Sequence, residues 1–302
     1  MSLQGLGRAA ANLGRVAALV AVLLTLVLAR AEVPLYVLVL ALGVGVVALL
    51  ALERTRAGFA LFVAYMAGFV LFALLRSAAD ETGIDVKGQY VVDGEERLFG
   101  GVLPTEWLQD RLYDPGEIGV VAVAATVVYL TYYFAVHVVA LALWRRNQAE
   151  FKRYALAVLL AVYAGLAVSF LVPTAPPWLA SEYSDEPPMA RVVAEVLGWN
   201  PEQAGDDTPG ANPFAAMPSL HFALTVLVAL ALWRRPSLRP VALLYLAAMG
   251  FALVYGGEHY VLDLLVGAGI AVAAWLVATR LAVRRGLGPR SGSDPRDQTP
   301  MV

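Results

Sequence analysis

The chain has 302 residues, of which 60% are hydrophobic and only 15% are charged, and its formal net charge is −2. Soluble domains carry about 25% charged residues, so the composition excludes an ordinary soluble protein and is typical of one that crosses a membrane repeatedly. The chain has no cysteine, which excludes disulfides and thiolate catalysis. No feature of the sequence indicates a nucleic-acid partner.

Long apolar segments predict an all-α, polytopic membrane bundle of about eight transmembrane helices. A helix needs about 20 apolar residues to cross roughly 30 Å of hydrocarbon. The eight segments cover residues 13–30, 33–52, 57–76, 117–144, 153–172, 219–233, 240–256 and 260–280. We expect a transmembrane hairpin over residues 1–56, a six-helix core domain over residues 57–285, and a disordered cytoplasmic tail over residues 286–302.

Positive charge is distributed unevenly among the connecting segments. With the N-terminus in the cytoplasm, the inner segments hold 16 of the 22 lysine and arginine residues, which predicts a multi-pass cell-membrane protein with both termini inside. Two long loops, residues 77–116 and 173–213, then lie outside. A short amphipathic helix at the membrane surface is expected within residues 98–116, and another short helix within residues 189–199. The stretch PTAPPWL (173–179) is too rich in proline for a helix.

The three histidines, His137, His221 and His259, all lie in or at the ends of predicted spans. Ionisable side chains at membrane depth are costly, and each is therefore a functional hypothesis. His259 precedes Asp263 by four residues, which places both on one face if the segment is helical. A carboxylate there can orient the imidazole as an acid does behind a catalytic histidine. The alternative is a structural polar pair that caps the last span.

His221 ends the sequence MPSLH. Pro218 suits the first turn of a helix, where its missing N–H costs nothing. Ser219 lies at the same end, where free backbone N–H groups and the helix dipole attract an anion such as phosphate. The spans that begin near His221 and His259 both start outside, so the two histidines are expected at one membrane level. The alternative for His221 is an interfacial histidine that meets lipid headgroups.

Two histidines, an orienting aspartate and a helix N-terminus at one level suit phosphoryl transfer. One histidine attacks phosphorus and the other protonates the leaving oxygen. This arrangement requires no metal, and the sequence has no obvious carboxylate cluster for magnesium. We therefore expect no metal and no cofactor.

The motifs MPSLH and EHYVLD resemble the histidine motifs of the type 2 phosphatidic acid phosphatase superfamily. The sequence PTAPPW, followed about forty residues later by AMPSLH, more narrowly resembles the branch that contains the fungal inositol phosphorylceramide synthases and their bacterial relatives. The resemblance covers roughly residues 137–267. It implies that His259 is a nucleophile that forms a phosphohistidine, that Asp263 orients it, and that His221 is the general acid. It also implies an active site at the outer membrane face.

The sequence departs from the wider family in its phosphate-binding motifs. The Lys-x6-Arg-Pro signature is absent, Ala252 and Leu253 stand where Ser-Arg is usual, and Leu220 replaces a glycine. The synthase-like branch shares these absences, which favours transfer over hydrolysis.

Other residues are candidates for contacting the substrate. Arg76 is the best-placed cation for phosphate, and Arg111 and Arg191 could reach the site from the loops; the alternative is an ordinary interfacial or solvated arginine. Trp178 is a candidate pocket wall, although a tryptophan here also suits interfacial anchoring. His137 is a candidate for lining the headgroup cavity or is a satisfied buried histidine.

The sequence thus predicts an integral-membrane lipid phosphotransferase that moves a phosphoryl or phospho-headgroup, with inositol phosphate among the candidates. The donor would be a lipid phosphate or phospholipid, and the acceptor a polyol, a lipid hydroxyl or water. One alternative is a lipid phosphate phosphatase. Another is a non-catalytic transporter or membrane scaffold with a buried polar cluster.

Overall fold

The computed structural model describes residues 56–77, 84–198 and 214–284, and this part of the chain contains helices and no strand. The N-terminal hairpin and the C-terminal tail that the sequence predicts fall outside the described residues. The helices are α3 (Arg56–Ser77), α4 (Gln89–Phe99), α5 (Pro104–Leu112), α6 (Val120–Leu130), α7 (Tyr132–Arg146), α8 (Gln148–Leu171), α9 (Ala180–Tyr183), α10 (Val192–Leu197), α12 (Leu220–Trp233), α13 (Arg239–Tyr255) and α14 (Val261–Arg284), with 3₁₀ turns at Pro177–Leu179 and Pro236–Leu238.

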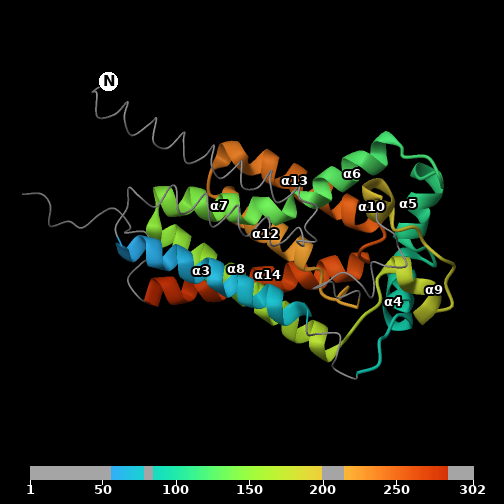
Figure 1. Ribbon diagram of the computed structural model, residues 1–302, viewed down its shortest axis with the longest axis horizontal. Coiled ribbons are helices and arrows are strands. Elements are labelled where there is room, and N and C mark those ends of the chain that lie inside the picture. Colours follow the sequence, from blue (N-terminus) through green and yellow to red (C-terminus); the bar gives the residue numbers. More distant parts are fainter. Residues whose placement is uncertain (1–55, 78–83, 199–213, 285–302) are drawn as a thin grey trace, which may run out of the picture.

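The long helices form one bundle in which α8 packs against α3, α7, α12 and α14 (Figure 1). Buried aromatic side chains fill the contact between α3, α7 and α8, where Phe62 stacks on Phe151 and meets Trp144 edge-on. Among the described residues three helices are long and apolar enough to cross a membrane, or four if one bent pair counts as a span. The all-α membrane bundle is confirmed, whereas the number of eight helices stays a prediction.

The span predicted over residues 117–144 is wrong as a single helix, because α6 and α7 meet at a bend of 42°. The bend lies at Thr131, whose hydroxyl donates to the carbonyl of Val128 at 2.5 Å and lies 3.0 Å from the Tyr245 hydroxyl on α13. A threonine hydroxyl that bonds a carbonyl of the preceding turn bends helices. The break therefore follows from a local bond that is reinforced by a neighbouring helix.

Four short helices, α4, α5, α9 and α10, gather at one end of the bundle, which we call the loop-covered end (Figure 1). Helices α5 and α10 confirm the two short helices predicted in the long loops. Helix α4 was not predicted, because the sequence QYVVDGEERLF is rich in acidic residues and contains Gly94. The proline-rich stretch 173–179 contains no α-helix, as expected, and only a 3₁₀ turn at its end.

An extended segment ties the loops to the sequence that precedes α12. The N–H of Lys87 donates to the carbonyl of Pro173 at 3.0 Å, and the N–H of Thr174 donates to the carbonyl of Phe214 at 2.7 Å. The N–H of Ala216 returns a bond to the carbonyl of Thr174 at 3.2 Å. The proline-rich segment therefore lies between the chain before α4 and the chain that leads to His221.

Candidate active site

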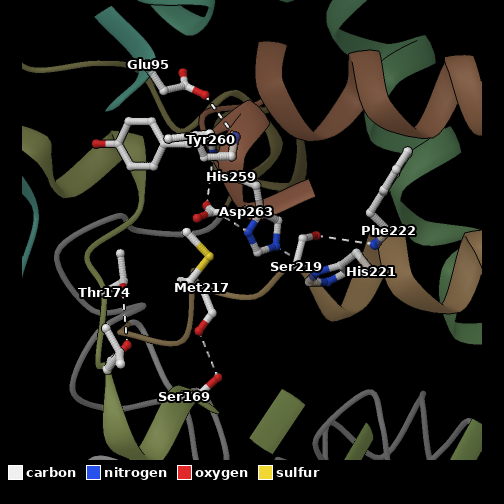
Figure 2. Close-up of polar contacts among 12 residues, drawn as sticks. Glu95, Ser169, Thr174, Met217, Ser219, His221, Phe222, His259, Tyr260 and Asp263 are labelled. Atoms are coloured by element: carbon white, nitrogen blue, oxygen red, sulfur yellow. Dashed lines mark hydrogen bonds and ion pairs between the residues drawn. The ribbon is translucent and has the colours of Figure 1, made fainter. Parts of the chain in front are cut away.

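His221 and His259 come together at the start of two neighbouring helices. His221 is the second residue of α12, and His259 lies two residues before α14. Nδ1 of His221 lies 3.0 Å from Nε2 of His259 (Figure 2). The two rings expected at one level are thus in direct contact.

Asp263 lies behind His259, with its Oδ2 atom 3.4 Å from Nδ1 of the imidazole. The same Oδ2 atom accepts the N–H of Tyr260 at 2.9 Å, and the carboxylate is completely buried. The expectation that both residues share a helical face is wrong, because His259 precedes the first turn of α14. Asp263 instead reaches back from that turn to cap the backbone at Tyr260, as the third residue of a capping box does. This cap brings the carboxylate next to the imidazole.

The contacts favour one arrangement of protons in the histidine pair. Nδ1 of His259 faces the Asp263 carboxylate at 3.4 Å without a hydrogen bond between them. Because a carboxylate can only accept, the tautomer with hydrogen on Nδ1 is the one that suits this pair, and it leaves Nε2 of a neutral His259 as an acceptor. A 3.0 Å contact between this Nε2 and Nδ1 of His221 needs a donor, and with this tautomer of His259 the donor is Nδ1–H of His221. This assignment follows from the network of neighbours. It leaves a lone pair on His259 and a proton on His221, facing each other.

Ser219 fixes the beginning of α12. Its hydroxyl accepts the N–H of Phe222 at 3.2 Å, which makes it the N-cap of the helix. Pro218 was expected in the first turn, and this is wrong, since Pro218 precedes the cap. The backbone N–H of Ser219 donates to the backbone carbonyl of Asp263 at 3.0 Å. This bond joins the two segments that carry the histidines.

Two glycines allow the segments around the histidines to pack closely. A Cβ atom at Gly267 on α14 would lie 2.3 Å from the carbonyl oxygen of Ser219. A Cβ atom at Gly165 on α8 would lie 2.4 Å from a methyl group of Leu220. Gly165 thus makes room for the leucine that stands where the wider family has glycine, so the departure at Leu220 is compensated by a neighbouring helix.

Aromatic rings from the broken span enclose His221. Tyr132 meets the imidazole edge-on at 4.0 Å between ring centroids, and Tyr129 lies at 5.0 Å. The hydroxyl of Thr225 donates to the backbone carbonyl of His221 at 2.9 Å. The bend at Thr131 therefore places one tyrosine on each side of the break against the ring of His221.

The predicted substrate-contacting residues have different surroundings. Arg76, in the last turn of α3, lies close enough to His221 to interact with it electrostatically. The N–H of Trp178 donates to the carbonyl of Gly257 at 3.2 Å, two residues before His259. Nδ1 of His137 instead forms a hydrogen bond with the Tyr65 hydroxyl at 2.9 Å, and the ring packs against Phe69. Its contacts are with α3 and do not include the histidine pair.

Arg111 and Arg191, the loop arginines, also differ from each other. Arg111 stacks on Trp107 of its own helix at 4.1 Å and donates to the carbonyl of that residue. Arg191 pairs with Glu258, the residue before His259, with 2.9 Å between Nε and Oε1. Only Arg191 of these two therefore contacts the segment that carries His259.

Two buried residues at the loop-covered end were not found from the sequence. Glu95 on α4 accepts the N–H of Leu262 in the first turn of α14 at 3.0 Å, and burial raises its pKa from 4.5 to about 7. Gln109 on α5 bonds both backbone groups of Ala190 and the carbonyl of Tyr255, each at 2.9 Å. Both lie on short polar helices with no motif. No local signal distinguishes them, because their partners are distant in the sequence.

Comparisons with known proteins identify the family of the chain. A sequence profile of the PAP2 superfamily matches residues 99–277, a range that includes both histidines and Asp263. The chain is also 32% identical over 209 residues to a phosphoinositol dihydroceramide synthase of Bacteroides thetaiotaomicron, and the alignment covers 64% of this chain and 67% of the relative. No solved structure matches the chain. The alternative of a non-catalytic transporter or scaffold is set aside, and the chain belongs to the PAP2 superfamily of membrane lipid phosphotransferases and phosphatases.

Proposed function

We propose that the protein transfers a phospho-headgroup from a phospholipid to a hydroxyl acceptor through a phosphohistidine on His259. The observation that carries the proposal is the histidine pair, with 3.0 Å between Nδ1 of His221 and Nε2 of His259 and a buried carboxylate 3.4 Å behind His259. A bare nitrogen, a protonated neighbour and an orienting acid are the three groups that this reaction needs.

In the first step the lone pair of His259 Nε2 forms a bond to phosphorus. The bond between phosphorus and the diacylglycerol oxygen breaks, and His221, which takes part in this step as the imidazolium, gives its Nδ1 proton to that oxygen and becomes neutral. Asp263 stabilises the positive charge that develops on His259. In the second step an acceptor hydroxyl attacks phosphorus, returns its proton to His221 and releases His259.

The two rings must separate when the substrate binds. A reacting nitrogen lies about 3–3.5 Å from phosphorus, and a proton donor lies about 2.6–3.2 Å from the oxygen it protonates. Because the leaving oxygen is opposite the attacking nitrogen, the two nitrogens must be about 6 Å or more apart in the reactive complex. The 3.0 Å contact is thus the closed resting pair, which keeps the nucleophile occupied until a lipid phosphate displaces His221.

Arg76 is the cation that we assign to the phosphate. Its charge acts on His221, and no salt bridge joins it to an acidic side chain among the residues that the structure describes. A positive charge without a compensating anion attracts the phosphate more strongly than a paired one. We place this site at the outer membrane face, with both termini in the cytoplasm, because 16 of the 22 lysine and arginine residues then lie inside.

The name of the relative guides the choice of substrates. A phosphoinositol dihydroceramide synthase is 32% identical to the chain, so phosphatidylinositol is the donor to test first and a ceramide-like lipid alcohol the first acceptor. Purified protein is incubated with the donor, with and without the acceptor, and the lipid products are identified by mass spectrometry. A headgroup found on the acceptor supports transfer, whereas release of free phosphate or inositol phosphate without acceptor indicates hydrolysis.

The variants His259→Ala and Asp263→Asn test the catalytic assignment. Loss of the nucleophile is expected to reduce turnover by about 10³-fold or more, and loss of the orienting acid by about 10²–10⁴-fold. Protein yield and elution on size exclusion should stay unchanged. Full turnover by His259→Ala would contradict the proposed mechanism.

A further inference from the structure

Three side chains from distant parts of the sequence form a cluster at the segment that carries His259. The guanidinium of Arg191 lies 4.5 Å from the centre of the Trp178 ring, and its Nε lies 2.9 Å from Oε1 of Glu258. Glu258 directly precedes His259 in the chain, and the backbone of Trp178 bonds Gly257. We call Trp178, Arg191 and Glu258 the Trp-Arg-Glu cluster.

The backbone around this cluster is built for close approach. Gly257 has a φ of +74°, and a Cβ atom there would lie 2.4 Å from the carbonyl oxygen of Ala190. Only glycine tolerates this combination. Gln109 bonds both backbone groups of Ala190 and also the carbonyl of Tyr255, so it ties the segment that carries Arg191 to the end of α13, just before the turn that leads to His259.

The charge of the cluster indicates which part of a substrate it suits. Arg191 is compensated by Glu258, so the pair carries no net charge and is a poor site for a phosphate. Arg76 has no salt bridge among the described residues. A carboxylate accepts hydrogen bonds from hydroxyl groups, and a guanidinium donates them. An indole ring adds an apolar face for a ring that bears hydroxyls.

The cluster also remains partly accessible. The side chain of Arg191 is 16% exposed and that of Glu258 is 9% exposed. An ion pair that is largely removed from water contributes little net stability compared with apolar packing, so its presence calls for a functional explanation. Binding of substrate hydroxyl groups would be such a function, because the pair is neutral overall, forms strong hydrogen bonds and lies at the segment that carries His259.

We propose that the Trp-Arg-Glu cluster binds the hydroxyl groups of a polyol ring carried by the phosphate that His259 attacks. The inference rests on the proposed function, since it assigns the headgroup part of the same site. Glu258 and Arg191 make the polar contacts, and Trp178 supports the ring. Arg76 then binds the phosphate, and the Trp-Arg-Glu cluster binds the polyol.

The test compares two donors that differ in the polyol. Full-length protein in nanodiscs is supplied with phosphatidylinositol or with phosphatidic acid, which lacks a polyol, and diacylglycerol release is measured. The variants are Glu258→Gln, Arg191→Lys and the conservative Trp178→Phe. The control is Glu195→Gln on α10, which removes a carboxylate that accepts the Tyr113 hydroxyl at the same end of the bundle.

We expect Glu258→Gln and Arg191→Lys to lower kcat/KM for phosphatidylinositol about tenfold or more, because a site built for hydroxyl groups is left with unpaired polar atoms. Trp178→Phe keeps an aromatic face and should have a smaller effect in the same direction. Turnover of phosphatidic acid should fall less than about threefold, and the control should change neither reaction. Equal losses for both donors would mean that the cluster only holds the loops together, and unchanged kinetics would mean that it is not used; either result overturns the inference.

Two further results separate this inference from the proposed function. If the wild-type protein cleaves phosphatidic acid but not phosphatidylinositol, headgroup transfer fails and the inference fails with it. If the wild-type protein cleaves both and the variants lose both equally, the inference alone fails.

Free myo-inositol added to the phosphatidic acid reaction distinguishes a free polyol from a lipid headgroup. If wild-type protein forms inositol phosphate and Glu258→Gln does not, the cluster also binds the free polyol.

Discussion

The contact between Gly267 and Ser219 offers a test of how closely the site depends on its geometry. In Gly267→Ala the new methyl group would lie 2.3 Å from the Ser219 carbonyl oxygen and 3.1 Å from the carbonyl carbon. Ordinary contacts at such an oxygen begin near 3.4 Å, so α14 and the cap of α12 must move apart by about 1 Å. The clash involves backbone, which cannot turn aside as a side chain can.

This movement changes the histidine pair directly. Ser219 caps the helix that carries His221, and its N–H bonds the backbone of Asp263. A displacement of about 1 Å between reacting groups can cost about 10²-fold in rate. We therefore expect Gly267→Ala to lower kcat for lipid turnover about 10²-fold, with a smaller effect on KM.

The matched control is Gly269→Ala on the same helix, where an added Cβ would meet nothing within 4 Å. Alanine is favoured over glycine in a helix by about 0.5–1 kcal/mol, so this control should keep its activity and melt slightly higher. Diacylglycerol release and thermal melting in detergent are measured for both variants. Normal kcat in Gly267→Ala would refute the reasoning that this contact sets the position of the histidines.

Three other changes test the loop-covered end and the core. Burial raises the pKa of Glu95 from 4.5 to about 7. The protonated carboxyl therefore contributes stability below pH 4.5, and this contribution is lost as the pH rises through 7. The loss is about 3 kcal/mol and should be absent in Glu95→Gln, so the difference in melting temperature between the variant and wild type should grow between about pH 5 and pH 8. A constant difference would contradict the raised pKa. Gln109→Leu should lower both melting temperature and turnover, since it leaves the carbonyl of Tyr255 unpaired; unchanged melting would show that these bonds are dispensable. Gly165→Ala should reduce turnover because the new methyl group displaces Leu220. The double variant Gly165→Ala/Leu220→Ala should recover activity, which a double-mutant cycle measures. If the losses of the two single variants simply add in the double variant, this contact is ruled out.

The sequence was informative where the signal is local. Apolar length located α8 and α14, two helices of 24 residues each, because the thickness of the hydrocarbon sets a minimum length. The distribution of arginine and lysine put the beginnings of two spans at one level, and the contact between His221 and His259 is consistent with that placement.

The sequence was uninformative where a partner is distant. Glu95 and the N–H of Leu262 are 167 residues apart, and Gln109 and Tyr255 are 146 apart. Each residue looks like part of an ordinary polar surface until the fold supplies its partner. The bend at Thr131 was missed for a similar reason, since a threonine is common in apolar helices and its contact with Tyr245 comes from another helix.

The most direct test of the central claim is to detect the covalent intermediate. Wild-type protein is mixed with a donor lipid without acceptor and quenched in alkali, where a phosphohistidine survives, and the peptide that contains His259 is examined by mass spectrometry. We predict a phospho-headgroup on His259, absent from His259→Ala and removed when acceptor is added before the quench. Lipid turnover at full rate while His259 stays unmodified, or labelling that persists in His259→Ala, would contradict the account.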